Sequence, residues 1–217
     1  MNLDDDDVFT PDNSGNVTND SYNDTDNIIR KERERKLRKK KAIKDEIISY
    51  VKIIVTTVVV TYLLLTFVII NAYIPSTSMQ NGLNVGDRLI GFRLAYVFSE
   101  PARGDVAIFR YPDDEEEIFI KRIIGLPGEV VRVANGHVYV GPDVDHLIQL
   151  EEDYIAEPMI NDGTSTDYYV PEGYYFMLGD NRNHSKDSRL WNNTYVAKDK
   201  ILAKAMFRYW PPFSAVK

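Results

Sequence analysis

Residues 130–140 read Val-Val-Arg-Val-Ala-Asn-Gly-His-Val-Tyr-Val, two short apolar runs joined by Asn135-Gly136. An Asn-Gly pair between two such runs is a strong signal for a tight β-hairpin, because both residues tolerate the positive φ angles of the turn. We therefore predict two antiparallel strands here, with the turn at 135–136.

Similar short apolar runs recur on both sides of this hairpin, separated by turn residues, and no helical periodicity of any length accompanies them. The sequence predicts a mainly β domain over 74–217, with a small β subdomain at 130–178. The polar residues 141–168 are interpreted as a surface insertion. The other predicted strands are 88–92, 105–111, 117–124, 174–178 and 203–209.

Toward the N-terminus, residues 53–73 form an apolar run without a charge. As a helix this run is about 31 Å long, which matches a hydrocarbon core of roughly 30 Å. It is longer than a signal-peptide core and begins about fifty residues into the chain, so we interpret it as a retained anchor. The predicted anchor helix covers 47–73, with Tyr50 and Tyr73 near its ends, where aromatic rings favour the interface.

A basic segment precedes this anchor: residues 30–44 contain ten Lys and Arg side chains. Loops rich in Lys and Arg stay in the cytoplasm, so this juxtamembrane segment, assigned to 30–46, predicts a single-pass protein with a cytoplasmic N-terminus and an extracytoplasmic domain. Residues 1–29 hold eight Asp and few apolar groups, and are expected to be a disordered acidic tail.

The net charge of −7 is due to that tail, since removing its eight acids from 33 leaves 25 against 26 bases. The remainder is nearly neutral, so we expect no nucleic-acid partner. The chain has no cysteine, which excludes disulfides and thiolate nucleophiles, and its three histidines are too scattered to predict a metal site.

Three motifs carry chemistry. The first, Ile74-Pro75-Ser76-Thr77-Ser78-Met79, directly follows the anchor. A serine hydroxyl needs a base to become a nucleophile, and a second hydroxyl two residues away can help to stabilise an oxyanion.

The second motif runs from Phe119 to Glu129 and contains Lys121 within an apolar strand. Burial disfavours a charged ammonium and lowers its pKa, and a neutral lysine is a competent general base. An edge-strand lysine that reaches water is the alternative interpretation of this segment alone.

The third motif, residues 179–191, reads GDNRNHSKDSRLW and follows an apolar strand. Asp187 and Arg189 are spaced for a charge-assisted pair that stiffens the loop, and Ser185 is a candidate to orient an amine.

The three motifs in this order resemble the bacterial type I signal peptidase family, in a compact form, over nearly all of 60–212. The resemblance implies an antiparallel β catalytic domain, a Ser78–Lys121 dyad without cofactor or metal, and cleavage of exported preproteins after small-x-small sites by a monomer at the cell membrane. It gives Ser76 an oxyanion role and makes Ser185 a hydrogen-bond partner of the lysine amine.

The resemblance further assigns Asp187 and Arg189 to support of the site. Substrate contacts are expected from Ile74, Pro75, Met79 and Ile120. Ile120 should point to the opposite face of a regular strand from Lys121, so a twist or bulge is expected there.

The sequence departs from the family pattern at Thr77, Asn192 and Ala203, where glycine is common; these positions bear on loop geometry and not on the dyad. Exposed apolar groups that would touch lipid are expected at Tyr96, Val97 and Phe98.

Four alternatives stay open: a Ser–His–Asp hydrolase using His184, a self-cleaving repressor, a dedicated peptidase for pilus or surface-protein precursors, and a non-catalytic anchored β module. A repressor should carry a DNA-binding helix-turn-helix at its N-terminus, where this chain has an acidic tail and a membrane span.

Overall fold

The computed structural model describes residues 17–155 and 157–216, with side chains outside 17–26. The chain divides into two units with the boundary between Val60 and Thr61. The second of these, from Thr61 onward, is called the β unit below.

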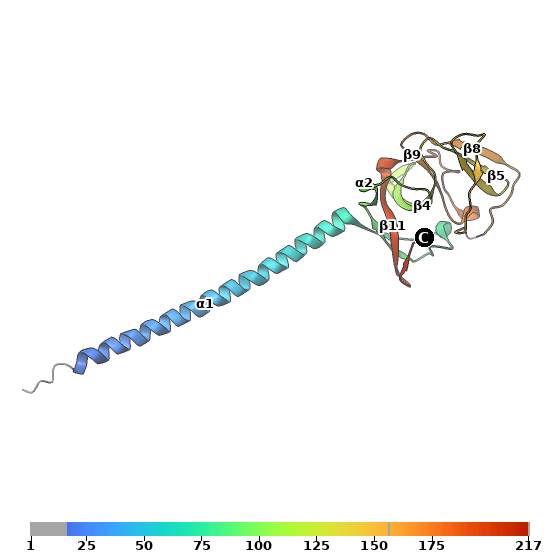
Figure 1. Ribbon diagram of the computed structural model, residues 1–217. Coiled ribbons are helices and arrows are strands. Elements are labelled where there is room, and N and C mark those ends of the chain that lie inside the picture. Colours follow the sequence, from blue (N-terminus) through green and yellow to red (C-terminus); the bar gives the residue numbers. More distant parts are fainter. Residues whose placement is uncertain (1–16, 156, 217) are drawn as a thin grey trace, which may run out of the picture. The chain divides into compact units, whose positions relative to one another are not determined.

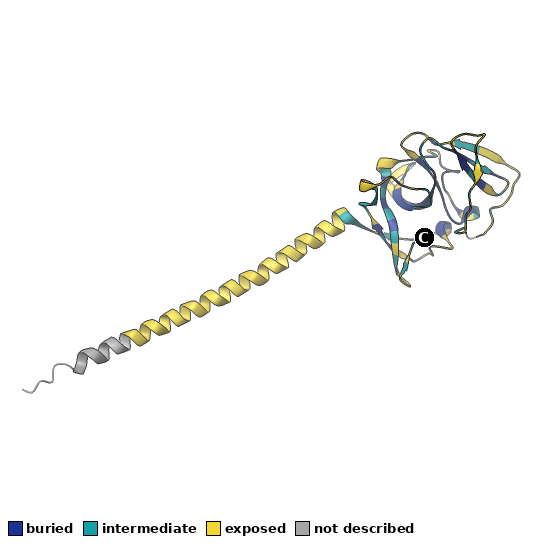
Figure 2. Ribbon diagram, in the orientation of Figure 1, coloured by how far each residue is buried: buried dark blue, intermediate teal, exposed yellow. Residues whose placement is uncertain are grey.

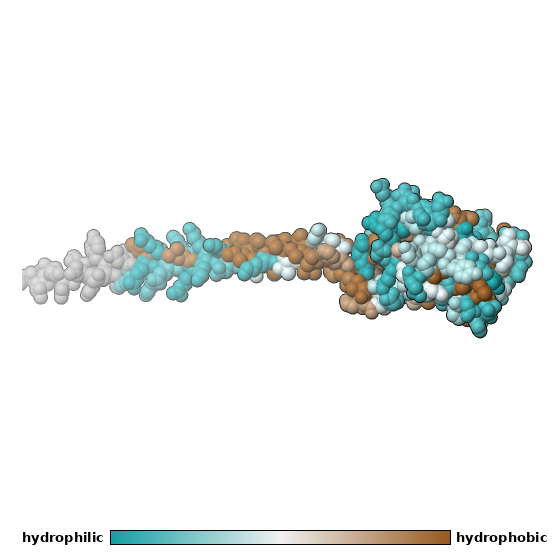
Figure 3. All heavy atoms as spheres, turned by 90° about the horizontal axis from the view of Figure 1, so that it is seen from above, coloured by the Kyte–Doolittle hydropathy of each residue, from teal (hydrophilic) through white to brown (hydrophobic). Residues whose placement is uncertain are grey.

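The N-terminal unit is formed by one long helix, α1 (Val17–Leu63), which a π-helical turn, η1 (Leu64–Val68), extends into the β unit. Its described side chains are exposed up to Phe67 (Figure 2). Hydrophilic residues give way to hydrophobic ones along it (Figure 3). Asn27–Val68 is the one helix in the described part of the chain that is long and apolar enough to cross a membrane.

Two predicted boundaries need correction, the end of the disordered tail and the end of the anchor helix. The disordered tail was predicted to reach residue 29, but α1 is helical from Val17; a helix extends easily once its first turns exist. Residues 1–16 of the predicted tail lie outside the described residues. At the other end, residues 69–73 are not helical: Ile69–Tyr73 form strand β1, because they pair with a neighbouring strand over five residues.

The helical, mainly apolar part of the span is therefore 47–68, which is about 33 Å long as a helix. It contains a single charge, Lys52, whose long stem allows the ammonium to reach an interface.

The β unit contains two antiparallel sheets (Figure 1). The large sheet has the strand order β1-β2-β11-β3-β4-β9-β10, with β12 paired to β11. Its strands after β1 are β2 (Arg88–Phe92), β3 (Val106–Tyr111), β4 (Asp114–Gly125), β9 (Tyr174–Leu178), β10 (Val196–Ala197), β11 (Ile201–Trp210) and β12 (Ser214–Ala215). A mainly antiparallel β fold is thus confirmed.

The small sheet has the order β7-β6-β5-β8. Its strands are β5 (Val130–Ala134), β6 (His137–Gly141), β7 (Ile148–Gln149) and β8 (Ser165–Tyr169). The predicted hairpin is confirmed, since Asn135 and Gly136 have φ angles of 54° and 78°.

The predicted subdomain boundary at 178 is wrong, because β9 pairs with β4 in the large sheet. The insertion at 141–168 also contains more structure than its sequence predicted. It supplies β7 and most of β8, and β8 pairs with β5 along five residues. An alternating pattern is weak in β8, so only its partner strand reveals it.

Short helical turns connect these strands: α2 (Ala95–Phe98), and the 3-10 turns η2 (Thr77–Met79), η3 (Arg182–His184) and η4 (Lys198–Lys200). The apolar core lies on both faces of the large sheet. One cluster includes Ile74, Met79 and Ile120, and another includes Phe109, Ile123 and Trp191. Strand β4 contributes to both clusters, because successive side chains point to opposite faces of a sheet.

Candidate active site

Ser78 lies in η2, five residues beyond the end of β1. Ile74 fixes the path between them, since its N–H donates to Asp87 O at 3.0 Å and its carbonyl accepts from Gly86 N at 2.9 Å. Ser78 is buried, with 8% of its surface exposed. Thr77 does not require a positive φ angle in this turn, so the β-branched residue is accommodated where glycine was expected.

Lys121 lies in the buried half of β4 and reaches Ser78. Its Nζ donates to Ser78 Oγ at 2.6 Å and to Ile120 O at 3.2 Å, and only 4% of the residue is exposed. As the alternation predicts, it shares a face with Phe119 and Ile123, and Nζ lies 5.4 Å from the Phe119 ring centroid.

The environment of Lys121 lowers its pKa from 10.5 to about 8. Burial is the largest cause, because an ammonium loses its hydration there; the nearby carboxylates of Asp187 and Asp180 act in the opposite direction. About a tenth of the amine is therefore neutral at pH 7 and can accept a proton.

A cavity of about 380 Å³ adjoins the two side chains. The four predicted substrate contacts, Ile74, Pro75, Met79 and Ile120, all line it, together with Tyr73, Ser76, Glu117, Ile118 and Phe119. Ser76 Oγ lies 3.3 Å from Ser78 Oγ. The geometry thus gathers the predicted nucleophile, base and second hydroxyl at one apolar hollow.

The bulge expected at Ile120 and Lys121 is absent from the β3–β4 pairing, which is regular from Phe119 to Arg122. Both residues nevertheless line the cavity, because the lysine side chain is long enough for its amine to fold back toward the carbonyl of residue 120.

The predicted pair of Asp187 and Arg189 is present as a two-pronged ion pair. Arg189 Nε and Nη2 lie 2.8 and 2.9 Å from the two carboxylate oxygens. Asp187 is completely buried and also accepts from Gly179 N at 3.1 Å. A bidentate pair with a buried carboxylate holds its loop in one conformation.

Ser185 departs from the prediction that it would hydrogen-bond the lysine amine. Its Oγ is buried and has no hydrogen-bond partner among the described residues. It packs instead against Gly179, where an added Cβ would lie 2.2 Å from Ser185 Oγ and 2.5 Å from Ser78 O. Only glycine fits at 179. Ser185 lies next to the Ser78 backbone, and no hydrogen bond joins its Oγ to Lys121 Nζ.

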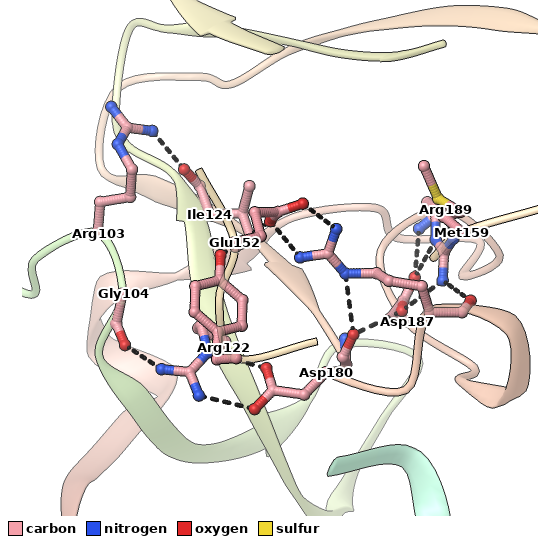
Figure 4. Close-up of polar contacts among 12 residues, drawn as sticks. Arg103, Gly104, Arg122, Ile124, Glu152, Met159, Asp180, Asp187 and Arg189 are labelled. Carbon is pink, nitrogen blue, oxygen red and sulfur yellow. Dashed lines mark hydrogen bonds and ion pairs between the residues drawn. The ribbon is translucent and has the colours of Figure 1, made fainter. Parts of the chain in front are cut away.

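Sequence reasoning missed two further buried ion pairs behind the site (Figure 4). Arg122 donates to Asp180 from Nε at 2.8 Å and from Nη2 at 2.6 Å, and Arg182 forms a two-pronged pair with Glu152. An arginine followed by a run of apolar strand residues, as at Arg122, is the signal that a buried counter-charge must exist.

Hydrogen bonds from Asn181 connect the 179–189 loop to the backbone of the nucleophile. Asn181 N donates to Ser78 O at 3.0 Å, and its side chain donates to Thr77 O at 3.2 Å. Arg182 Nε donates to Gly179 O at 3.1 Å within the loop. The loop therefore fixes the backbone of η2 on one side, while β4 supplies the amine from the other.

His184 does not have the position that a Ser–His–Asp triad with Ser78 would require. The His184 side chain is 71% exposed, and its ring lies 4.0 Å from the Glu157 carboxylate. Ser78 Oγ contacts Lys121 and Ser76 instead.

Comparison with known proteins agrees with this arrangement. The family model described as "Signal peptidase, peptidase S26" matches residues 47–210. The chain is 42% identical over 144 residues to a probable signal peptidase I-2 of Synechocystis, covering 64% of this chain and 62% of that one. It is 41% identical over 152 residues to a signal peptidase I of Leptolyngbya laminosa, covering 64% and 68%.

A crystal structure of a signal peptidase I from Enterococcus faecalis is 31% identical, with a TM-score of 0.40, and the match covers 49% of this chain and 97% of that one. For the Synechocystis and Leptolyngbya relatives, the matched regions span 62% and 68% of their length. Since the family model covers most of the sequence, including every residue of the site described above, the chain belongs to the signal peptidase family, peptidase S26.

Proposed function

We propose that this chain is a membrane-anchored serine endopeptidase that removes signal peptides from exported preproteins. The observation that carries the proposal is the 2.6 Å contact of Lys121 Nζ with Ser78 Oγ beside an apolar cavity. A non-catalytic β module has no use for a buried lysine held against a serine hydroxyl, because such burial costs stability.

The chemistry is acyl transfer. With its amine neutral, Lys121 accepts the proton of Ser78 as Oγ attacks the scissile carbonyl, and the oxyanion that forms is stabilised by the Ser78 N–H and Ser76 Oγ. Lys121 then gives the proton to the leaving amine as the peptide bond breaks. Water, deprotonated by the same amine, hydrolyses the ester and restores Ser78.

The cavity supports specificity for small residues. Ile74, Met79 and Ile120 are at most 9% exposed and contribute apolar walls. Such walls favour an alanine-sized side chain next to the cut and offer no partner for a charged one.

We also propose that the N-terminus lies in the cytoplasm and the β unit outside it, because the basic residues 30–44 precede the span. One copy of the chain supplies both Ser78 and Lys121, which supports a monomer as the active species.

A preprotein with alanine one and three places before its cleavage site is expected to be cut by the full chain in detergent. Leucine one place before the cut should lower kcat/KM about 100-fold, since the rigid cavity walls oppose the added methylene groups. Product masses give the position of the cut. Absence of cleavage of the alanine substrate by folded protein would favour the non-catalytic module.

The pH dependence of kcat/KM should rise with pH and reach half its plateau near pH 8, where Lys121 loses its proton. Because the neutral amine is the active form, activity at pH 7 should be about a tenth of the plateau. Lys200→Gln is the matched control, since that lysine pairs with Glu115 in an exposed position and should leave the midpoint unchanged. A midpoint above pH 10 would contradict a dry, neutral base.

A further inference from the structure

A second hollow of the β unit lies away from the candidate dyad, beside α2. Its volume is about 570 Å³, and its lining includes two cationic residues and one acidic residue, Arg93, Lys198 and Asp199, together with Tyr96 and Val97. None of these residues contributes to the dyad or to the cavity next to it.

Arg93 stands at the point where the apolar helix ends. Its N–H donates to Val68 O at 2.8 Å, and Val68 is the last residue of the candidate membrane span. A residue at the end of a span lies at the level of the lipid headgroups. This position follows from a backbone hydrogen bond within the β unit and does not depend on how α1 is oriented.

Among the described residues, no carboxylate lies within ion-pair distance of the Arg93 guanidinium, although Asp199 lines the same hollow. The Nε atom of Arg93 is buried and has no hydrogen-bond partner among these residues. Lys198, on the same hollow, is already paired with Glu100 at 2.5 Å. A buried donor without a partner is costly, and a guanidinium fork matches a phosphate group in shape and charge.

Apolar side chains of α2 are presented to solvent beside this hollow, and Val97 lines it together with Arg93. In α2, Val97 is 65% exposed and Phe98 is 84% exposed. An arginine with an empty donor, flanked by exposed apolar groups at the end of a span, combines the features that recognise the two parts of a phospholipid.

We propose that this hollow binds the phosphate of a phospholipid of the surrounding bilayer, with Arg93 as its donor and Val97 and Phe98 against the acyl region. The inference rests on the proposed membrane anchoring and not on the peptidase chemistry. Its consequence is that a lipid molecule fixes the height of the β unit at the membrane surface.

Native mass spectrometry of the full chain in dodecyl maltoside, titrated with dioleoyl phosphatidylglycerol, counts bound lipids directly. Arg93→Gln is expected to weaken one binding site roughly tenfold, since a charge-assisted fork is lost, and Arg93→Lys should weaken it less. The matched control is Arg88→Gln, at the other end of β2 and exposed, which should bind lipid as the wild type does.

A second variant, Phe98→Ser, keeps the test independent of the arginine, because so exposed a side chain contributes little to folding. It should also weaken binding. Equal lipid binding by wild type, Arg93→Gln and Phe98→Ser would overturn the proposal, as would displacement of the lipid by millimolar glycerol 3-phosphate, which would identify a site for a free phosphate.

Preprotein cleavage measured on the same samples separates this inference from the proposed function. If the Arg93→Gln protein cleaves the preprotein in detergent but no longer binds the lipid, the result supports the lipid site. Cleavage by wild type with no lipid bound would overturn the site and leave the peptidase assignment intact, whereas bound lipid without cleavage would do the reverse.

Discussion

Lys121→Met is expected to abolish preprotein cleavage and, at the same time, to stabilise the folded chain at neutral pH. Loss of the general base should lower kcat at least about 10³-fold. The gain in stability arises because methionine fills a similar volume without an ammonium to desolvate. A pKa that falls from 10.5 to about 8 corresponds to a burial cost of about 3 kcal/mol.

The sign of the pH dependence follows from the lowered pKa. Below pH 8 the amine is charged in both states, and the cost is present in full; between pH 8 and 10.5 the unfolded chain binds more protons, so wild-type stability rises. The advantage of Lys121→Met over wild type should therefore be largest below pH 8 and vanish above 10.5. Urea unfolding in detergent, followed by the fluorescence of the buried Trp191, measures it.

Ser78→Ala is the matched control for this variant. It should lose cleavage to the same degree, because the nucleophile is gone, but without the gain in stability. A Lys121→Met protein that still cleaves at more than a few per cent of the wild-type rate would refute the dyad, and one that is less stable than wild type would refute the desolvation argument.

Asp180→Asn is expected to destabilise the fold by about 3–5 kcal/mol, because it removes the carboxylate charge from a buried ion pair. The Asp180 and Arg122 side chains are 1% and 5% exposed, and they share two hydrogen bonds. Arg122 keeps its contacts with Gly104 O and the Tyr154 ring, neither of which carries a negative charge. Urea unfolding gives the change in free energy.

The double variant Arg122→Met with Asp180→Leu tests whether the loss of stability comes from the lost carboxylate charge. Replacing both members of a buried pair by apolar groups is often neutral, so it should recover most of the stability. Where Asp180→Asn still cleaves, its pH midpoint should shift below that of wild type, since the Asp180 charge raises the pKa of Lys121. A double variant as unstable as the single one would show that shape, not charge, is decisive.

Both predictions concern charged groups that the fold buries around Ser78. Two buried arginine–carboxylate pairs, Arg122–Asp180 and Arg182–Glu152, and the partly buried pair Arg189–Asp187 surround the loop that holds Ser78 O. Each restricts the loop through charge-assisted bonds. The burial of Lys121 costs stability, whereas these pairs restrict the loop beside it.

Much of this protein follows from its sequence by local rules. Short apolar runs between turn residues predicted seven strands, Asn135-Gly136 predicted the hairpin, and the run after residue 52 predicted a membrane-length helix. Each is a preference that neighbouring residues impose on the backbone. The motifs also singled out Ser78, Lys121 and the Asp187–Arg189 pair, because a resemblance transfers residues in order along the chain.

Only the tertiary structure decided which distant groups meet. Ile69–Tyr73 is a strand because β2 lies beside it, and β8 exists because β5 pairs with it. Arg122 finds Asp180 across 58 residues, while Ser185 packs on Gly179 instead of reaching the lysine. The pKa of Lys121 likewise depends on burial by many neighbours. Pairing partners and desolvation are set by positions in space, and a periodicity along the chain contains no information about them.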